Sequence, residues 1–154
     1  MAQGQGTPDA LALRVARHLR SREGTGAAWN IEIEEVREGY ARIAMVVRKD
    51  MLNGHAIAHG GMIFSLADTA FAYACNSRNL ETVAQQASIV FLAPAREGDR
   101  LVAEAREQSR AGRSGVYTVS VCRNGGEPVA QFQGLSRAIG GTVLPDEPLG
   151  EGAP

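Results

Sequence analysis

Cysteine is scarce in this chain, with two residues among 154, and this scarcity excludes a scaffold held together by disulfides. Cys75 falls in an apolar stretch and Cys122 in a strand-like one, and neither has a second cysteine at metal-ligand spacing. We therefore expect two reduced thiols, as in proteins of the cytosol. A chain of 154 residues is long enough for one domain to be stabilised by its own core.

An excess of one charge and a long apolar run are also missing. The formal net charge is −1, so no global field attracts nucleic acid or an anionic membrane. No run reaches the ~18 apolar residues of a membrane span. The N-terminal stretch lacks the basic start, apolar core and cleavage site of a secretion signal. These features predict a soluble, cytoplasmic protein with no nucleic-acid or membrane partner.

Glycine, proline and acidic residues gather at the two ends of the chain, 1–6 and 143–154. They predict mobile tails around a single domain, 7–142. The domain opens with a predicted helix that has Thr7 as N-cap, Pro8 in the first turn and Gly24 at its end. His18 on this helix has no polar cluster nearby in the sequence, and we interpret it as structural.

Strand-like stretches surround a second, long apolar helix at 59–76. Alternation and turn residues predict six strands, at 29–36, 40–48, 82–94, 99–110, 114–123 and 128–139. Their short connections favour antiparallel neighbours, so we expect an α+β fold with one curved antiparallel sheet around the helix. A helix that is apolar on nearly every side must be covered all round. One sheet covers one side, so a second copy of the chain is expected to cover the rest.

A carboxylate near the middle of this apolar helix, Asp68, calls for an explanation, because lone buried charges are costly. The polar residues of the helix recur at steps of three, one, four and three, which places them on one helical face. They are Ser65, Asp68, Thr69, Tyr73 and Asn76. This pattern predicts that Asp68 points into a polar seam. A helix–helix interface with satisfied hydrogen bonds would show the same spacing.

The entrance of the helix reads His59-Gly60-Gly61. First-turn N–H groups have no partners within a helix, and glycine lets a substrate approach them closely. Such a helix end can bind the negative oxygen that develops on an attacked carbonyl. Alternatively, the two glycines only relieve crowding where the loop enters the helix.

Helix geometry limits how Gly60 and Asp68 could cooperate. Eight residues separate them, or about 12 Å along the axis, which is too far for one helix to act on one carbonyl at both points. If both act on it, a second, antiparallel helix must supply one of them. Two-fold symmetry would then place two equal sites at a dimer interface.

A metal site is the other chemistry that this region could suggest. His55 and His59 stand four residues apart, a spacing that metal ligands use on helices. Both precede the helix, however, and no third ligand is evident. The sequence therefore predicts no metal site.

The segment 51–77, "MLNGHAIAHGGMIFSLADTAFAYACNS", resembles the hotdog-fold acyl-CoA thioesterases of the phenylacetic acid degradation type, because it carries their signature N-G-H-x-x-x-H-G-G-x-x-F-S-L-A-D. The resemblance extends from about Asp9 to Thr142. It implies a sheet wrapped round a long helix, dimers, and usually a homotetramer made of two dimers. It also implies a coenzyme A thioester as substrate, and no separate cofactor.

The resemblance assigns roles by position. The family's catalytic carboxylate falls on Asp68, and the backbone N–H that polarises the thioester carbonyl falls on Gly60. His59 and Asn53 match positions that line and orient the thioester. Some relatives have an assisting polar residue on the strand after the helix, but that strand reads Ala-Gln-Gln at 84–86 here. This departure leaves the positioning of the attacking water, or of an acyl-enzyme, open.

Coenzyme A is expected near the turn "AGRSGVY". There Gly112 and Ser114 would offer hydrogen-bond donors to its phosphates and Arg113 a positive charge. Arg137 matches another basic position near the nucleotide, and Thr69 is assigned to the substrate. Each arginine could instead be ordinary solvated surface charge.

The combined prediction is an acyl-CoA thioesterase of phenylacetate degradation, which hydrolyses (hydroxy)phenylacetyl-CoA or a similar aryl or medium-chain acyl-CoA. Asp68 would either attack the carbonyl directly or deprotonate a water. One alternative is a non-catalytic acyl-CoA-binding or sensing domain with the same fold. Others are a dehydratase-type lyase, which pairs a catalytic histidine with a carboxylate, and a purely structural oligomer. The set of Asp68, His59 and Gly60 favours the hydrolase.

Overall fold

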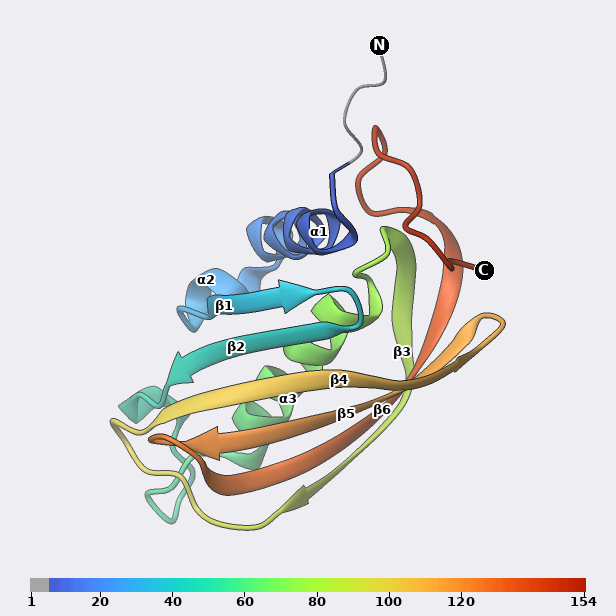
Figure 1. Ribbon diagram of the computed structural model, residues 1–154. Coiled ribbons are helices and arrows are strands. Elements are labelled where there is room, and N and C mark those ends of the chain that lie inside the picture. The colour runs from blue at the N-terminus through green and yellow to red at the C-terminus, as the bar shows by residue number, and fades with distance from the viewer. Residues whose placement is uncertain (1–5) are drawn as a thin grey trace.

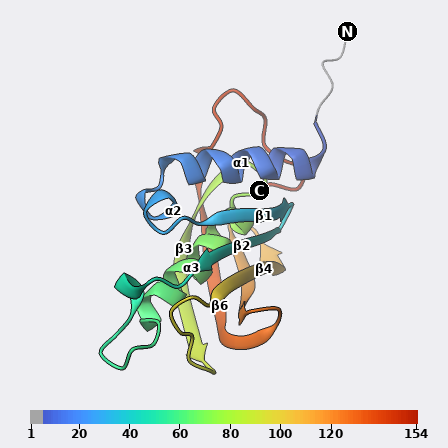
Figure 2. The same ribbon diagram turned by 90° about the vertical axis from the view of Figure 1, so that its left-hand side faces the viewer.

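The computed structural model describes residues 6–154. Along the chain it contains α1 (Pro8–Arg22), α2 (Gly24–Ala28), β1 (Glu32–Arg37), β2 (Tyr40–Val46), the 3-10 turn η1 (Lys49–Met51), α3 (Gly60–Cys75), β3 (Leu80–Phe91), β4 (Arg100–Ala111), β5 (Ser114–Arg123) and β6 (Glu127–Thr142). In Figure 1 the sheet curls around α3, and in Figure 2 α1 lies across the β1 end of the molecule. The predicted α+β class, with six strands and a central helix, is confirmed.

All six strands belong to one antiparallel sheet, in the order β1-β2-β4-β5-β6-β3. The chain leaves β2, forms α3 against the sheet, and resumes with β3 at the far edge. As a result β1 and β3 are the two edge strands. β3 pairs with β6 along one side only, and most of its residues are exposed.

The core lies between the sheet and α3. Phe71 of the helix is buried, with ring centroids 5.4 Å from Tyr117 and 5.8 Å from Phe132. Gly134 on β6 lies directly against this ring, since a Cβ built there would be 2.8 Å from Phe71 atoms. The missing side chain therefore allows the helix to approach the sheet closely.

The first helix ends earlier than predicted. Thr7 is its N-cap, accepting a hydrogen bond from the N–H of Ala10 at 3.2 Å. Its last residue is Arg22, because Glu23 is extended and accepts a hydrogen bond from the Tyr73 hydroxyl on α3. Gly24 does not end the helix but begins α2.

The first strand begins later than predicted. Trp29, predicted as a strand residue, is the C-cap of α2. Asn30 has a left-handed backbone, with φ 51°, which interrupts the extended path. β1 therefore starts at Glu32.

The cover of α3 comes largely from its own chain. The sequence predicts a second copy on the side away from the sheet, but α1 packs there and Tyr73 is fully buried. Thr69 and Asn76 are buried too, so the five residues of the predicted polar seam do not all face the same surroundings. The half-buried residues form a narrower stripe, which includes Ser65, Asp68 and Ala72.

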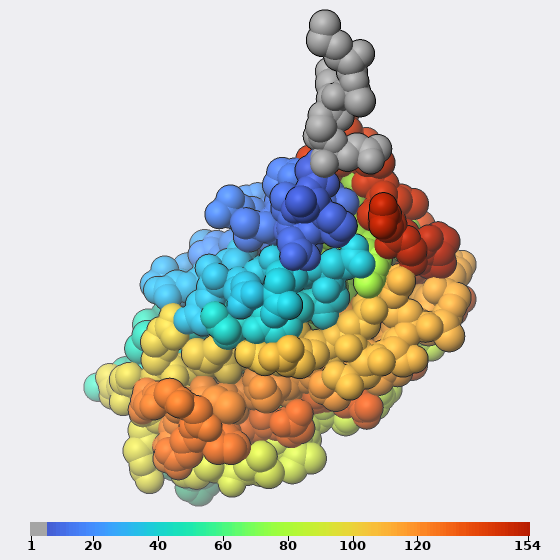
Figure 3. All heavy atoms as spheres, viewed as in Figure 1, coloured from blue at the N-terminus to red at the C-terminus, as the bar shows by residue number. Residues whose placement is uncertain are grey.

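The segment after β6 lies against the domain, where the sequence predicts a tail from residue 143. Asn79 is fully buried, and its side-chain amide donates to the carbonyls of Leu144, Glu147 and Pro148 at 3.0–3.1 Å. Glu147 also pairs with Arg14 of α1, and Figure 3 shows the segment beside this helix. The folded domain therefore continues past Thr142. The predicted N-terminal tail, 1–6, lies outside the described residues except for Gly6.

Candidate active site

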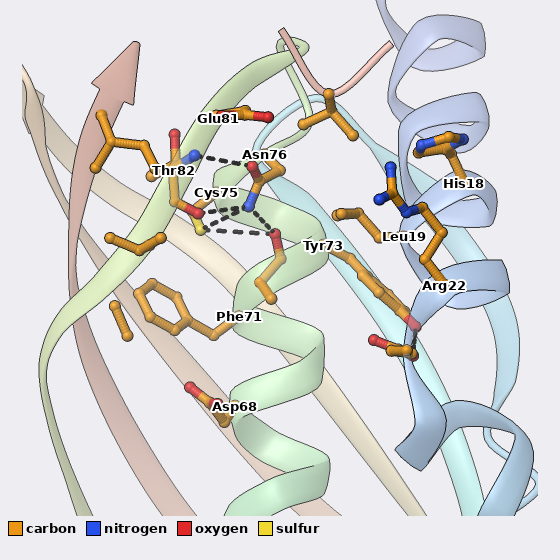
Figure 4. A pocket seen from close by; sticks show the side chains of 16 residues that line it. His18, Leu19, Arg22, Asp68, Phe71, Tyr73, Cys75, Asn76, Glu81 and Thr82 are labelled. Carbon is orange, nitrogen blue, oxygen red and sulfur yellow. Dashed lines mark hydrogen bonds between the residues drawn. The ribbon is translucent and has the colours of Figure 1, made fainter. Parts of the chain in front are cut away.

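Asp68 projects from the middle of α3 into a cavity (Figure 4). Its carboxylate is half-buried, and burial raises the pKa of this group above its ordinary value. No cation or hydrogen-bond donor within residues 6–154 opposes that shift. A carboxylate that is poorly solvated and unpaired is a stronger base and nucleophile than one in water.

The cavity beside Asp68 has a volume of about 540 Å³ and lies between α1, α3 and β3. Its α1 wall includes His18, whose Nε2 is buried and has no hydrogen-bond partner among the described residues. The sequence alone indicates a structural residue with no polar cluster nearby. Fifty residues separate His18 from Asp68 in the sequence, so no local pattern could have shown that both line one cavity.

A second carboxylate on the same wall, Glu23, is already engaged. The Tyr73 hydroxyl donates a hydrogen bond to it. Burial raises the pKa of Glu23, although this hydrogen bond and the charge of Arg20 act in the opposite direction. Glu23 therefore connects α1 to α3, whereas Asp68 has no partner in the described chain.

At the entrance of α3, His59 is the N-cap, and its Nδ1 accepts a hydrogen bond from the Gly61 N–H at 2.9 Å. A neutral imidazole in this arrangement carries its proton on Nε2. Gly60 is the first residue of the helix, where a backbone N–H has no intrahelical acceptor. Of the two glycines, Gly60 therefore has its N–H available to a ligand.

Asn53 shapes the loop that leads to this helix end. Its side-chain oxygen accepts hydrogen bonds from the N–H groups of His55 and Ile57, at 2.9 and 3.4 Å. The tight turn places Ala56 in the left-handed region, with φ 58°. The side-chain amide of Asn53 is left for other contacts, and Asn53 and Gly60 line a second cavity of about 470 Å³.

Gly60 and Asp68 line two different cavities of the chain. This agrees with their separation along the helix: one chain does not present both groups to one carbonyl. Thr69 is not brought to either cavity, because it is buried and its hydroxyl donates to the Ser65 carbonyl at 2.8 Å. Its expected contact with substrate has no support in this geometry.

The residues expected near coenzyme A come together at one end of the sheet. Gly112 has φ 56° in the turn between β4 and β5. Arg113 follows it, and its Nε donates to the Ala138 carbonyl at 3.0 Å. Ser114 on β5 pairs with Arg137 on β6.

This group adjoins the Asp68 cavity. Arg137 pairs with Val83 on β3, and Val83 lines that cavity together with Ala84. Gln85 lies at a register shift of β3. Of residues 84–86, where the chain departs from the family pattern, Ala84 is therefore the one that lines this cavity, and it offers no polar side chain.

The described residues contain no cluster of three or more histidine, cysteine or acidic side chains that could hold a metal ion. Both His55 and His59 are exposed. None of the helices in the same range is long and apolar enough to cross a membrane.

Comparison with known proteins agrees with the resemblance seen in the sequence. The Thioesterase superfamily profile matches residues 55–130. The chain is 43% identical to the acyl-coenzyme A thioesterase PaaI of Escherichia coli strain K12 over 128 residues, which are 83% of this chain and 91% of that protein. The structure of E. coli PaaI, from the phenylacetic acid degradation operon, matches with a TM-score of 0.86 and 41% identity over 88% of this chain and 99% of that one.

A further structure, of a mutant phenylacetic acid degradation protein PaaI from Thermus thermophilus, matches with a TM-score of 0.73 and 33% identity. It covers 76% of this chain and 100% of that one. The predicted family and its hotdog fold are thereby confirmed. The chain belongs to the thioesterase superfamily, among the hotdog-fold acyl-CoA thioesterases of the phenylacetic acid degradation type.

Proposed function

We propose that this protein hydrolyses the thioester of an acyl-CoA, with Gly60 of one chain and Asp68 of a second chain acting on the same carbonyl. One observation carries the assignment of the two residues. Within residues 6–154, the structure presents an unpaired, half-buried carboxylate and an unsatisfied helix N-terminus in two separate cavities. Each is half of a site for acyl transfer.

In the proposed site, the Gly60 N–H is the group that polarises the thioester carbonyl. Hydrogen bonding to the thioester oxygen, aided by the helix dipole, stabilises the negative charge that develops there. Removing one such donor costs about 10²–10³ in kcat in other enzymes. His59 holds the neighbouring Gly61 N–H, and Asn53 holds the loop, so both keep this helix end in place.

In the proposed site, the Asp68 carboxylate is the group that acts as nucleophile or as general base. In one route it attacks the carbonyl carbon, the C–S bond breaks, coenzyme A leaves as its thiolate, and water hydrolyses the mixed anhydride. In the other it removes a proton from a water that attacks, and the proton passes to the departing sulfur. The raised pKa of Asp68 makes the carboxylate more basic in both routes.

The second chain would pair along β3. This edge strand has twelve residues, one of them charged, and Val83 and Val90 are 46% and 60% exposed. A long edge with so little charge is a ready surface for strand pairing. Two-fold pairing of β3 with its copy would set the two half-buried stripes of α3 against each other and form two sites. We also propose that two dimers assemble into a homotetramer, located in the cytoplasm.

Coenzyme A would bind at the β4–β5 turn. Gly112 and Ser114 would offer donors to the phosphates, and Arg113 and Arg137 positive charge. The pairing of Ser114 with Arg137 supports this grouping. The proposed acyl groups are phenylacetyl, its ring-hydroxylated forms, or medium-length chains, and the proposed role lies in phenylacetate degradation.

The test is thiol release from phenylacetyl-, hydroxyphenylacetyl-, hexanoyl- and decanoyl-CoA. Asp68→Asn should lower kcat by about 10²–10⁴. Gly60→Pro removes the N–H at a first helical position, where proline is tolerated. Gly60→Ala is its matched control, because it adds a Cβ but keeps the N–H. We expect the proline variant to fall about 10² below the alanine variant in kcat.

Three results would contradict the proposal. Equal kcat values for Gly60→Pro and Gly60→Ala would mean that the Gly60 N–H takes no part in the reaction. Full turnover in Asp68→Asn would mean that the Asp68 carboxylate takes no part in the reaction. Tight coenzyme A binding by a folded wild type that cleaves none of the four thioesters would indicate a binding module.

A further inference from the structure

Phe91 lies directly on Gly60. It is the last residue of β3, and a Cβ built on Gly60 would be 2.9 Å from its Cζ and 3.3 Å from both Cε atoms. The aromatic ring therefore occupies the space that a side chain at position 60 would take. It stands beside the N–H proposed to hold the thioester oxygen, while remaining 51% exposed.

The two cavities of the proposed site differ in chemistry. Among the described residues, those that line the cavity at Gly60 are apolar apart from Asn53. The cavity at Asp68 includes Arg22, Glu23 and Glu81 among its lining residues. It also reaches Val83, the neighbour of the proposed coenzyme A residue Arg137.

An acyl-CoA has two arms of different polarity on either side of its carbonyl. The pantetheine arm carries two amides and leads to the nucleotide, whereas the acyl arm is largely apolar. Matching polarity to polarity places the pantetheine arm along the Asp68 cavity and the acyl arm in the Gly60 cavity. The carbonyl lies where the two cavities meet in the proposed dimer.

The position of the bound carbonyl relative to the Phe91 ring then determines which part of the acyl group the ring contacts. A hydrogen bond from the Gly60 N–H places the carbonyl oxygen about 3 Å from that nitrogen. The carbon next to the carbonyl, the α-carbon of the acyl group, is two bonds from this oxygen. It therefore falls beside the helix end that Phe91 covers. A methylene fits beside the ring, and a branch at that carbon meets it.

We propose that Phe91 is a specificity-determining residue that limits the bulk of the acyl group at its α-carbon. The preferred substrates are then acyl groups with a CH₂ next to the carbonyl, either arylacetyl or straight-chain, over their α-branched counterparts. This inference rests on the function proposed above. It also gives Gly60 a second reason to be glycine, because a larger residue there would push the ring toward the substrate.

The test compares matched pairs of thioesters that differ by one α-methyl group: phenylacetyl-CoA with 2-phenylpropanoyl-CoA, and hexanoyl-CoA with 2-methylhexanoyl-CoA. In Phe91→Ala the kcat/KM ratio of branched to unbranched substrate should rise about tenfold or more, the scale of one methyl group in a close-fitting pocket. Phe91→Leu, which keeps the apolar cover, should shift the ratio in the same direction by less. Val46→Ala is the control, because Val46 is a similarly exposed apolar residue, lies on β2 away from the proposed β3 pairing, and lines neither cavity.

The possible failures are distinguishable. An active wild type whose ratio stays unchanged in both Phe91 variants would overturn the inference alone. So would an equal loss for branched and unbranched substrates, which would place Phe91 against the pantetheine arm or in a structural role. A folded wild type that cleaves none of the four thioesters would overturn the proposed function, and this inference with it.

Discussion

Two variants that are each inactive should restore activity to one another when their subunits exchange, because the proposed site takes Gly60 from one chain and Asp68 from the other. The perturbation is to mix Asp68→Asn with Gly60→Pro. In a mixed dimer, one site receives Gly60 from the first variant and Asp68 from the second, so both groups are intact. The other site receives both substitutions.

The expected magnitude follows from this arrangement. Equal amounts and random pairing of subunits make half of the dimers mixed, and half of the sites in each mixed dimer are complete. Activity should therefore return to about 25% of an equal amount of wild type. The structural basis is that Gly60 and Asp68 line different cavities of one chain and lie about 12 Å apart along α3.

The assay is thiol release from phenylacetyl-CoA after the two proteins are partly unfolded together and refolded, with two affinity tags to isolate the mixed dimer. A control chain carries both substitutions and is mixed with wild type. Neither site of that mixed dimer is complete, so activity should fall to about half of the unmixed sum. Mixed Asp68→Asn and Gly60→Pro dimers with no more activity than their parents would refute the interface site.

Two further predictions concern stability. Burial raises the pKa of Asp68, so the ionised carboxylate costs the folded state free energy at pH values above that pKa. Asp68→Asn should therefore melt at a higher temperature than wild type at pH 7. The difference should shrink as the pH falls through the raised pKa of Asp68 and be lost below about 3.9, where the carboxyl is protonated in both the folded and the unfolded state. A less stable variant at pH 7 would contradict this. Gly134→Ala forces a methyl group against the buried Phe71 ring and should lower the free energy of unfolding by about 1–3 kcal/mol in urea titrations. Gly24→Ala, whose Cβ meets no atom within 4 Å, is the control, and equal stability of the two variants would count against the clash.

Local patterns were sufficient for the fold class. Alternation of apolar residues and glycine turns predicted the strands, and β5 starts and ends as predicted, at Ser114 and Arg123. Long-range contacts set other boundaries of helices and of the folded domain, which therefore differ from the predicted ones. Helix α1 ends where Glu23 meets Tyr73, fifty residues away. The segment after β6 is held by Asn79, whose amide reaches the Leu144 carbonyl across 65 residues. Neither contact leaves a signal in the residues next to it.

The candidate site also combines features that local sequence patterns predict with features that depend on long-range contacts. The motif around Gly60 and Asp68 and the distance between them could be read directly, because a helix sets that distance whatever surrounds it. The direction in which each polar residue points could not. Thr69 and Tyr73 share a helical face with Asp68 by spacing, yet both are buried.

The sequence by itself determined the family of the protein, the helix that carries Asp68 and the glycine at its entrance. These depend on residue type and on the regular rise of a helix. Only the tertiary structure decided that Asp68 has no partner in the described chain, and that Phe91 covers Gly60 from a strand 31 residues away. The physical reason is that burial and contact depend on which elements pack together, and the curl of the sheet brings together residues that local periodicity keeps apart.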